Sequence, residues 1–113
     1  MIAHIVLFRP RASLDRDERT ALINSFSRAL AEIPSIRRTR LGRRVKHGRA
    51  YEQMMREDYE FAVVLEFDDV DGLMAYLQHP SHDELAERFF AAFDIALMYD
   101  YDMGEGQSIV FSD

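Results

Sequence analysis

Residues 59–82 read YEFAVVLEFDDVDGLMAYLQHPSH, and they predict a strand followed directly by a helical region. In the first nine residues the large apolar side chains fall at alternate positions, which is the period of a β-strand. These side chains are Tyr59, Phe61, Val63, Leu65 and Phe67. Ala62 and Val64 make the opposite face of the same strand apolar as well. Neither face of this strand therefore suits contact with water, and we expect both faces to be covered.

The helical region after this strand is interrupted within HPSH, residues 79–82. Proline lacks an amide hydrogen and disfavours the helical conformation in the residue before it, so His79 should end a first helix over 69–78. Pro80 at a first helical position and Glu84 in the first turn favour the start of a second helix over 80–93. The sequence therefore predicts that HPSH joins two helices.

The rest of the chain supplies the other elements of the sheet and one more helix. They are a strand at 2–8, a helix that runs from a cap at Ser13 or Asp15 to about Glu32, a strand at 35–45 and a last strand at 96–103. The strand at 2–8, IAHIVLF, is apolar on both faces and should be an interior strand. Residues 46–58 fit either a polar loop or an extension of the second strand.

The resulting order is β-α-β-β-α-β, which is typical of a ferredoxin-like α+β unit. We expect one domain over residues 1–103 and a tail over 104–113, whose apolar residues 109–111 could dock on this subunit or on a partner. Such a unit places both helices on one face of its sheet and leaves the other face bare. Because that face is apolar here, we expect a homodimer whose sheets face each other as a dimeric α+β barrel.

Composition narrows the class of protein. A chain of 113 residues without cysteine has no disulfide framework and no thiolate for a metal site, which fits the cytoplasm. The apolar part of its N-terminus is too short to span a membrane. The net charge of −6 argues against nucleic-acid binding, although residues 37–49 hold seven of the 14 Lys and Arg. That basic stretch is either an anion-binding surface or a solvated strand that meets an acidic partner surface.

Four stretches together resemble the stress-responsive A/B barrel (Dabb) family. They are HIVLFRP (4–10), IPSIRRTRLGRRV (33–45), the opening stretch 59–82 and YDY (99–101). The run AYLQHPSH is the most specific part. The resemblance implies two ferredoxin-like subunits in a dimeric α+β barrel, and it covers the chain to about Met103. Most members of the family have no assigned activity.

A plant branch of that family, the olivetolic acid cyclases, closes a linear polyketide by an intramolecular aldol condensation. The second histidine of its His-Pro-x-His motif is the general base, and a tyrosine six residues earlier supports it. Residue by residue, the resemblance implies catalytic roles for His82 and Tyr76. The family also has a histidine early in its first strand, which corresponds to His4 and implies a catalytic role for it as well. The chain departs from the branch at LGR (41–43), where the plant enzymes carry Trp-Gly-Lys.

Helical geometry places His82 on the apolar side of its predicted helix. Leu85, Ala86, Phe89 and Phe93 all lie within about 60° of it. Leu85 and Phe89 are therefore expected to contact a ligand, with His79 at the rim. An inward imidazole can take up a proton near neutral pH. Alternatively, His82 donates to a backbone carbonyl, Tyr76 is a packing residue and His4 is a satisfied core histidine.

Three functions remain open on these residues. The first is binding of a small, largely apolar molecule inside the barrel without turnover. The second is a cofactor-independent cyclase or lyase, with His82 as base and with Tyr76 and His4 orienting a substrate carbonyl or enolate. The third is a structural dimer whose interior is filled by its own side chains. An open pocket of roughly 300 Å³ or more that reaches His82 separates the first two from the third. No metal is expected, because His79, His82 and Asp83 lack an obvious further ligand, and no cofactor motif is present.

Overall fold

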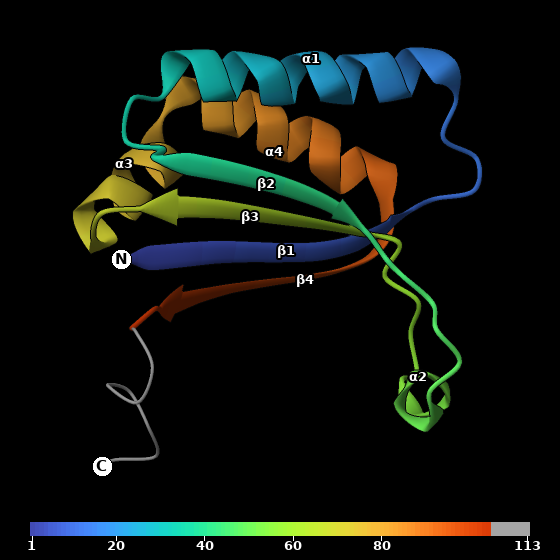
Figure 1. Cartoon of the computed structure of the whole chain (residues 1–113). Coiled ribbons are helices and arrows are strands. Elements are labelled where there is room, and N and C mark those ends of the chain that lie inside the picture. Colours follow the sequence, from blue (N-terminus) through green and yellow to red (C-terminus); the bar gives the residue numbers. More distant parts are fainter. Residues whose placement is uncertain (105–113) are drawn as a thin grey trace.

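The computed structural model describes residues 1–104, which form one four-stranded sheet and four helices (Figure 1). The strands are β1 (Ile2–Pro10), β2 (Arg38–Arg43), β3 (Phe61–Phe67) and β4 (Phe93–Asp102), and the helices are α1 (Arg16–Glu32), α2 (Ala50–Met54), α3 (Val70–Gln78) and α4 (Pro80–Ala92). The sheet order is β2-β3-β1-β4, and every neighbouring pair is antiparallel. The predicted ferredoxin-like α+β fold is confirmed.

Strand β1 lies inside the sheet, as its two apolar faces predict. It pairs with β3 on one side and with β4 on the other. His4 is opposite Leu65 of β3 and Asp100 of β4, so these three side chains share one face of the sheet. This register decides which residues can meet at the site, because a shift of one residue would turn His4 to the other face.

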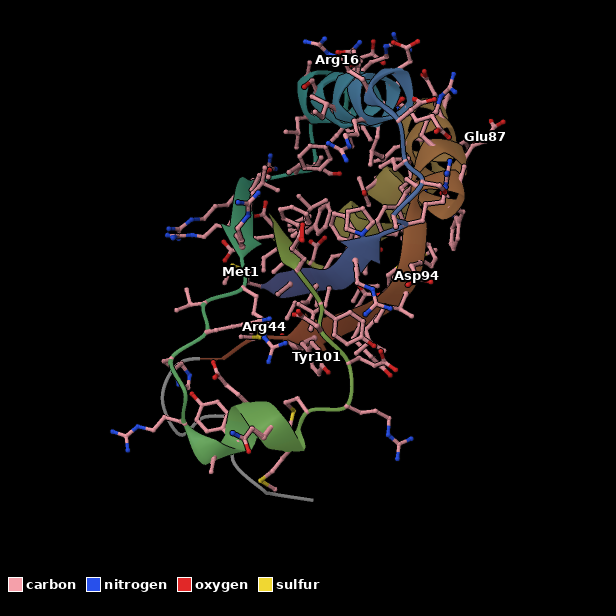
Figure 2. The ribbon with its side chains drawn as sticks, turned by 90° about the vertical axis from the view of Figure 1, so that its right-hand side faces the viewer. Met1, Arg16, Arg44, Glu87, Asp94 and Tyr101 are labelled. Carbon is pink, nitrogen blue, oxygen red and sulfur yellow. The ribbon has the colours of Figure 1, made fainter. Side chains whose placement is uncertain are left out.

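The long helices cover a single face of the sheet, as Figure 2 shows. Asp15 begins α1 with a capping box, in which its side chain accepts from the Glu18 amide and Glu18 accepts from the Asp15 amide. Of the two expected caps, Asp15 is therefore the one used. Helix α1 packs mainly against α4, and polar contacts between Ser81 and Glu32 and between Arg28 and Glu84 join the two helices.

The junction between α3 and α4 forms where HPSH predicts it. His79 has extended backbone angles, with φ −74° and ψ 140°, and Pro80 is the first residue of α4. The His79 side chain caps α4, since its Nδ1 accepts a hydrogen bond of 3.0 Å from the Ser81 amide. The chain therefore turns here without leaving that amide unpaired.

The packed core lies where α3 meets the sheet. Leu65 and Phe67 are almost fully buried, and Leu73 and Tyr76 of α3 pack in the same cluster. The Tyr76 and Phe67 rings are 5.4 Å apart between centroids. Burial of such a side chain stabilises the fold by roughly 1.5–3 kcal/mol. This core holds the first residues of β1 and the start of α4 in place.

The sheet face away from the helices, here called the open face, is largely apolar. The strand register assigns it Ala3, Ile5, Leu7, Ala62, Val64, Leu97, Tyr99 and Tyr101, together with Glu66 of β3 and Arg38 and Arg40 of the β2 edge. Leu97, Tyr99 and Tyr101 are 36%, 54% and 49% exposed. An apolar sheet face of this kind is suited to packing against another protein surface.

Residues 44–60, here called the arm, differ from both expectations for this region. They contain the short helix α2 instead of being a plain loop or a continued strand. The Glu52 carboxylate accepts from the backbone amides of His47 and Gly48, and Gly48 has φ +84°, a conformation that glycine adopts without strain. These local contacts fold the arm back after β2 ends at Arg43.

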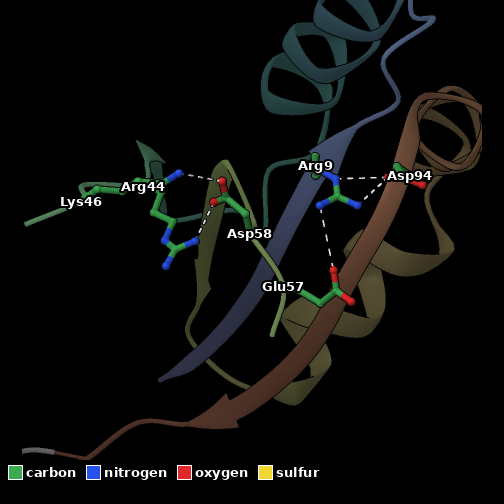
Figure 3. Close-up of polar contacts among 6 residues, drawn as sticks. All are labelled: Arg9, Arg44, Lys46, Glu57, Asp58 and Asp94. Carbon is green, nitrogen blue, oxygen red and sulfur yellow. Dashed lines mark hydrogen bonds and ion pairs between the residues drawn. The ribbon is translucent and has the colours of Figure 1, made fainter. Parts of the chain in front are cut away.

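Two sets of ion pairs brace the strand ends beside the arm (Figure 3). Arg44 and Lys46 both contact Asp58, at 2.7 and 3.0 Å. Arg9 contacts Asp94 at 2.6 Å and Glu57 at 3.9 Å. The lowered pKa of Asp58 follows from its hydrogen bonds to Arg44 and Lys46. Arg37 also pairs with Asp68. Three basic side chains of the stretch 37–49 are therefore paired with acidic residues of the same chain.

Several boundaries differ from the sequence-based ranges. Strand β2 begins at Arg38 rather than 35, and β4 begins at Phe93 rather than 96, because its pairing with β1 continues to Pro10. Residues 105–113, which include the apolar end of the tail, lie outside the described residues, and docking of the tail stays a prediction. Across residues 1–104, no helix combines the length and apolarity needed to cross a membrane.

Candidate functional site

An open cleft of about 580 Å³ lies between the helices and the sheet of one chain. Its walls are almost entirely apolar and come from α1 (Leu22, Phe26, Leu30), α4 (Leu85, Ala86, Phe89) and the sheet (Val6, Phe8, Phe61, Val63). This volume exceeds the roughly 300 Å³ that distinguishes a ligand-binding protein from a structural dimer with a filled interior, and it is in the range of small-molecule sites. The cleft is on the helix side of the sheet. A ligand is therefore expected between the helices and the sheet of one chain, and not between the two facing sheets of a dimer.

The cleft exists because the two long helices pack mainly on each other. The apolar sides of α1 and α4 face the sheet across the cleft, and several apolar side chains at its rim are left exposed. Ile23 of α1, Phe90 of α4 and Leu41 of β2 are each at least 60% exposed. An apolar rim around an apolar cleft favours entry of an apolar molecule.

His4 and His82 lie together at one end of the cleft. Both line it, and the Tyr76 ring packs against both imidazoles, with centroids 5.8 Å from His4 and 4.7 Å from His82. Each residue is held by a different element, since His4 is in β1, Tyr76 in α3 and His82 in the first turn of α4. The α3–α4 junction sets the distance between Tyr76 and His82.

His4 is oriented by a carboxylate. Its Nδ1 lies 2.6 Å from Oδ1 of Asp100, the residue opposite it on β4. In the neutral imidazole, an Nδ1–H that donates to this carboxylate leaves the lone pair on Nε2. His4 is nevertheless 8% exposed and belongs to the cleft wall, so it combines a satisfied nitrogen with contact to the cleft.

His82 is poised to be neutral near pH 7. Burial lowers its pKa below the usual 6.5, and the charge of His4 acts in the same direction. The negative charge of Asp83 and the polar backbone of Leu77 raise the pKa of His82, but their combined effect is smaller. Within the described residues, Nδ1 of His82 is buried and has no hydrogen-bond partner. A neutral imidazole with a free nitrogen can accept a proton or a hydrogen bond.

Tyr76 has the opposite character. It is only 4% exposed, and burial, with the nearby Asp100 carboxylate, raises its pKa to about 12. Its phenol therefore stays protonated at neutral pH and can donate a hydrogen bond but cannot act as a base. The site thus offers one neutral imidazole beside one protonated phenol.

The far end of the cleft is aromatic. The ring of Phe8 lies 5.6 Å from Phe61 and 5.1 Å from Phe89, measured between centroids. His82 and Phe89 are seven residues apart on α4, which corresponds to roughly 10 Å along the helix axis. The cleft therefore runs from a polar end at the two histidines to an aromatic end at Phe89.

The structure brings together most, but not all, of the residues named from the sequence. His4, His82, Leu85 and Phe89 line the cleft, and Tyr76 lies directly behind the two histidines. His79 is absent from the cleft lining, because its side chain caps α4. Within residues 1–104, no three His, Asp or Glu side chains are grouped so as to hold a metal ion.

Sequence reasoning missed Asp100 and the sheet side of the cleft. Phe8 and Phe61 belong to two of the predicted strands and line the cleft, but strand alternation does not show which face of a sheet meets a ligand. Asp100 stands in the run YDYD of β4, where an acid among apolar and aromatic residues is the available signal. Its partner becomes visible only once the β1–β4 register is known.

Comparison with known proteins gives a family and a fold. The stress responsive A/B barrel domain (Dabb) matches residues 2–103. An uncharacterised protein of Streptomyces coelicolor is 33% identical over 87 residues, which are 73% of this chain and 79% of that protein.

Solved structures agree with this match. A dimeric ferredoxin-like protein of unknown function from Thermobifida fusca has a TM-score of 0.68 and 25% identity, with 90% of each chain covered. A protein of Arabidopsis thaliana has a TM-score of 0.75 and 19% identity, covering 94% of this chain and 98% of its own. A hydroxynitrile lyase from Passiflora edulis has a TM-score of 0.77 and 18% identity, covering 93% and 94%. The last two share the fold, and the chain belongs to the stress responsive A/B barrel (Dabb) family.

Proposed function

We propose that this protein is a homodimer that binds a small, largely apolar molecule carrying a polar group, such as a carbonyl. The observation that carries the proposal is the 580 Å³ cleft, which is apolar along its length and ends at His4 and His82. An apolar tail would lie toward Phe89, and the polar group would take a hydrogen bond at the histidine end. Dimeric relatives and the apolar open face support the homodimer.

A series of methyl ketones tests this proposal by isothermal titration calorimetry. Affinity should rise from 2-butanone to 2-octanone by about fourfold for each added methylene, because burial of one methylene contributes about 0.8 kcal/mol to the binding free energy. Ala86→Trp fills the cleft and should abolish binding of 2-octanone. Ala75→Trp, on the exposed side of α3, is the matched control and should bind normally. Equal affinities for short and long ketones would contradict the proposal.

The site also supports a second candidate function, a cofactor-independent cyclase or lyase. The specific observation is the pairing of opposite pKa changes, lowered at His82 and raised at Tyr76, in side chains whose rings are in contact. Groups whose pKa values are driven apart are the usual basis for acid and base roles. His82 is then the base, Tyr76 supports it, and His4 helps to orient the substrate oxygen.

The reaction is a proton transfer followed by carbon–carbon bond formation. His82 removes a proton from the carbon next to a carbonyl, and the negative charge spreads onto the carbonyl oxygen. The enolate carbon then bonds to a second carbonyl carbon of the same molecule. The proton held by His82 passes to the resulting alkoxide, so the imidazole returns to its neutral form.

Exchange of α-protons isolates the first step without the natural substrate. The protein is mixed with 2-octanone in D₂O, and loss of the α-proton signals is followed by NMR. His82→Gln should slow protein-catalysed exchange by about 100-fold or more, the usual contribution of a general base, while 2-octanone still binds. His47→Gln, in the arm, is the control and should exchange at the normal rate. Unchanged exchange in His82→Gln would leave only the binding function.

Two further expectations stay proposals. We place the protein in the cytoplasm, which its lack of cysteine supports. We also expect no nucleic-acid partner, since the net charge is −6 and Arg37, Arg44 and Lys46 of the basic stretch pair with acids of the same chain.

A further inference from the structure

The arm is preorganised but carries no core of its own. Its base is closed by a hydrogen bond from the Arg44 amide to the Glu60 carbonyl and by the ion pairs of Asp58. Nearer the tip, the Tyr51 hydroxyl lies 2.7 Å from Nε2 of His47, and Glu52 accepts two backbone amides. Helix α2 nevertheless has five residues and none of them is buried. Isolated helices of this length are not stable in water without packing.

The apolar side chains of the arm point away from the chain's own core. Val45, Tyr51, Met54 and Met55 are 76%, 58%, 75% and 56% exposed. All four are among the more exposed large apolar side chains of residues 1–104, and all four lie between residues 45 and 55. A local network that holds such side chains in place without covering them is typical of a contact surface.

The position of the arm points to the partner. Figure 2 shows α2 on the opposite side of the sheet from α1, which is the side of the open face. The homodimer proposed above would cover that face with a second sheet. An arm that extends past the face on this side meets whatever packs there, so its apolar side chains continue the same surface.

The two edges of the sheet also suit a second copy of this chain. On the open face, the β2 edge carries Arg38 and Arg40, and the β4 edge carries Tyr99 and Tyr101. A two-fold axis parallel to the strands, between two facing sheets, sets β2 of one copy over β4 of the other. Arg38 and Arg40 of each copy then face tyrosine rings of the other, whereas an orientation that sets β2 over β2 would bring arginines of like charge together.

We propose that the arm is a clasp for the second subunit, in which Tyr51, Met54 and Met55 pack on the partner's sheet near the start of its β4. The arm leaves β2 at the end where β4 begins, since Gly42, Ala62, Leu7 and Leu97 are successive neighbours across the sheet. In the stated orientation, that end of β4 in the other copy lies within reach. Each subunit gives one arm and receives one, as an isologous interface requires.

A single tryptophan reports on docking of the arm, because the chain contains no tryptophan. Met54→Trp places it on α2, and Met74→Trp places the matched control on the exposed side of α3. In the dimer, acrylamide should quench the fluorescence of the arm tryptophan severalfold less than that of the control. Equal quenching at the two positions would overturn the proposal.

Dimer affinity gives the second measurement, and it separates this inference from the homodimer on which it rests. By sedimentation across a range of concentrations, Tyr51→Ser combined with Met54→Ser should raise the dimer Kd at least tenfold, as loss of central apolar contacts does. Met74→Ser should leave the Kd unchanged. An unchanged Kd in the arm variant overturns the clasp alone. A wild-type protein that stays monomeric at all concentrations overturns both proposals.

Discussion

The imidazole of His82 links the charge state of the site to the stability of the fold. Its pKa is lowered in the folded chain, chiefly by burial, so the unfolded chain binds the proton more readily. Between the folded pKa and 6.5, the unfolded state therefore holds more protons on this group than the folded state. His82 makes no pH-dependent contribution above 6.5, and it destabilises the fold as the pH falls below 6.5.

Replacement of His82 by glutamine should remove that part of the acid sensitivity. The free energy of unfolding, measured with urea at intervals from pH 5 to 8, should fall less steeply below pH 6.5 in His82→Gln than in the wild type. His47→Gln is the control, because His47 lies in the arm away from the cleft. Parallel curves for the wild type and His82→Gln would show that burial does not lower this pKa.

The histidine end of the cleft also shows what side-chain chemistry reveals before the fold is known. His82 could be assigned to an apolar helix face from its spacing to Leu85 and Phe89, and the structure places all three in the cleft. Asp100 could not be assigned, because a contact between residues 96 positions apart depends on strand register. Ligand contact and catalysis by these residues remain predictions.

The junction between α3 and α4 gives a role to His79 that spacing alone did not reveal. A residue before proline must leave the helical conformation, and the side chain that stands there is free to cap the next helix. His79 does so through Nδ1 and the Ser81 amide. The same conformation that ends α3 therefore begins α4, and it sets the separation of Tyr76 and His82.

His79→Ala should lower the free energy of unfolding by about 1 kcal/mol, the usual cost of losing a helix cap. Denaturation with urea at pH 8 measures this change. Binding of 2-octanone should be unaffected, because the His79 side chain does not line the cleft. Weaker ketone binding with unchanged stability would instead support the ligand-contact role that the sequence predicted for His79.

Strands and long helices were predictable because their periodicity and caps are local properties. The alternation in β3, the capping box at Asp15 and Pro80 each act within a few residues. The arm was not predictable in this way. Helix α2 depends on Glu52 accepting amides four and five residues earlier and on Gly48, and neither feature changes the hydrophobic pattern.

The sheet presents the cleft on one face and, in our proposal, the subunit interface on the other. One face forms the floor of the cleft, and the open face is the surface that we assign to the second subunit. Because successive residues of a strand point to opposite faces, neighbouring positions in β4 lie on different faces of the sheet. Met98 lines the cleft, whereas Tyr99, with 54% of its surface exposed, is on the open face.

A matched pair of aspartate variants in β4 tests this division. Tyr99→Asp places a charge where a second sheet would pack, so it should raise the dimer Kd at least 100-fold in sedimentation while each monomer still binds 2-octanone. Met98→Asp places the same charge in the cleft and should weaken ketone binding at least tenfold without changing the dimer Kd. Circular dichroism confirms that both variants are folded. If Met98→Asp dissociates the dimer and Tyr99→Asp does not, the subunit interface lies on the helix side, and the assignment of the two faces must be reversed.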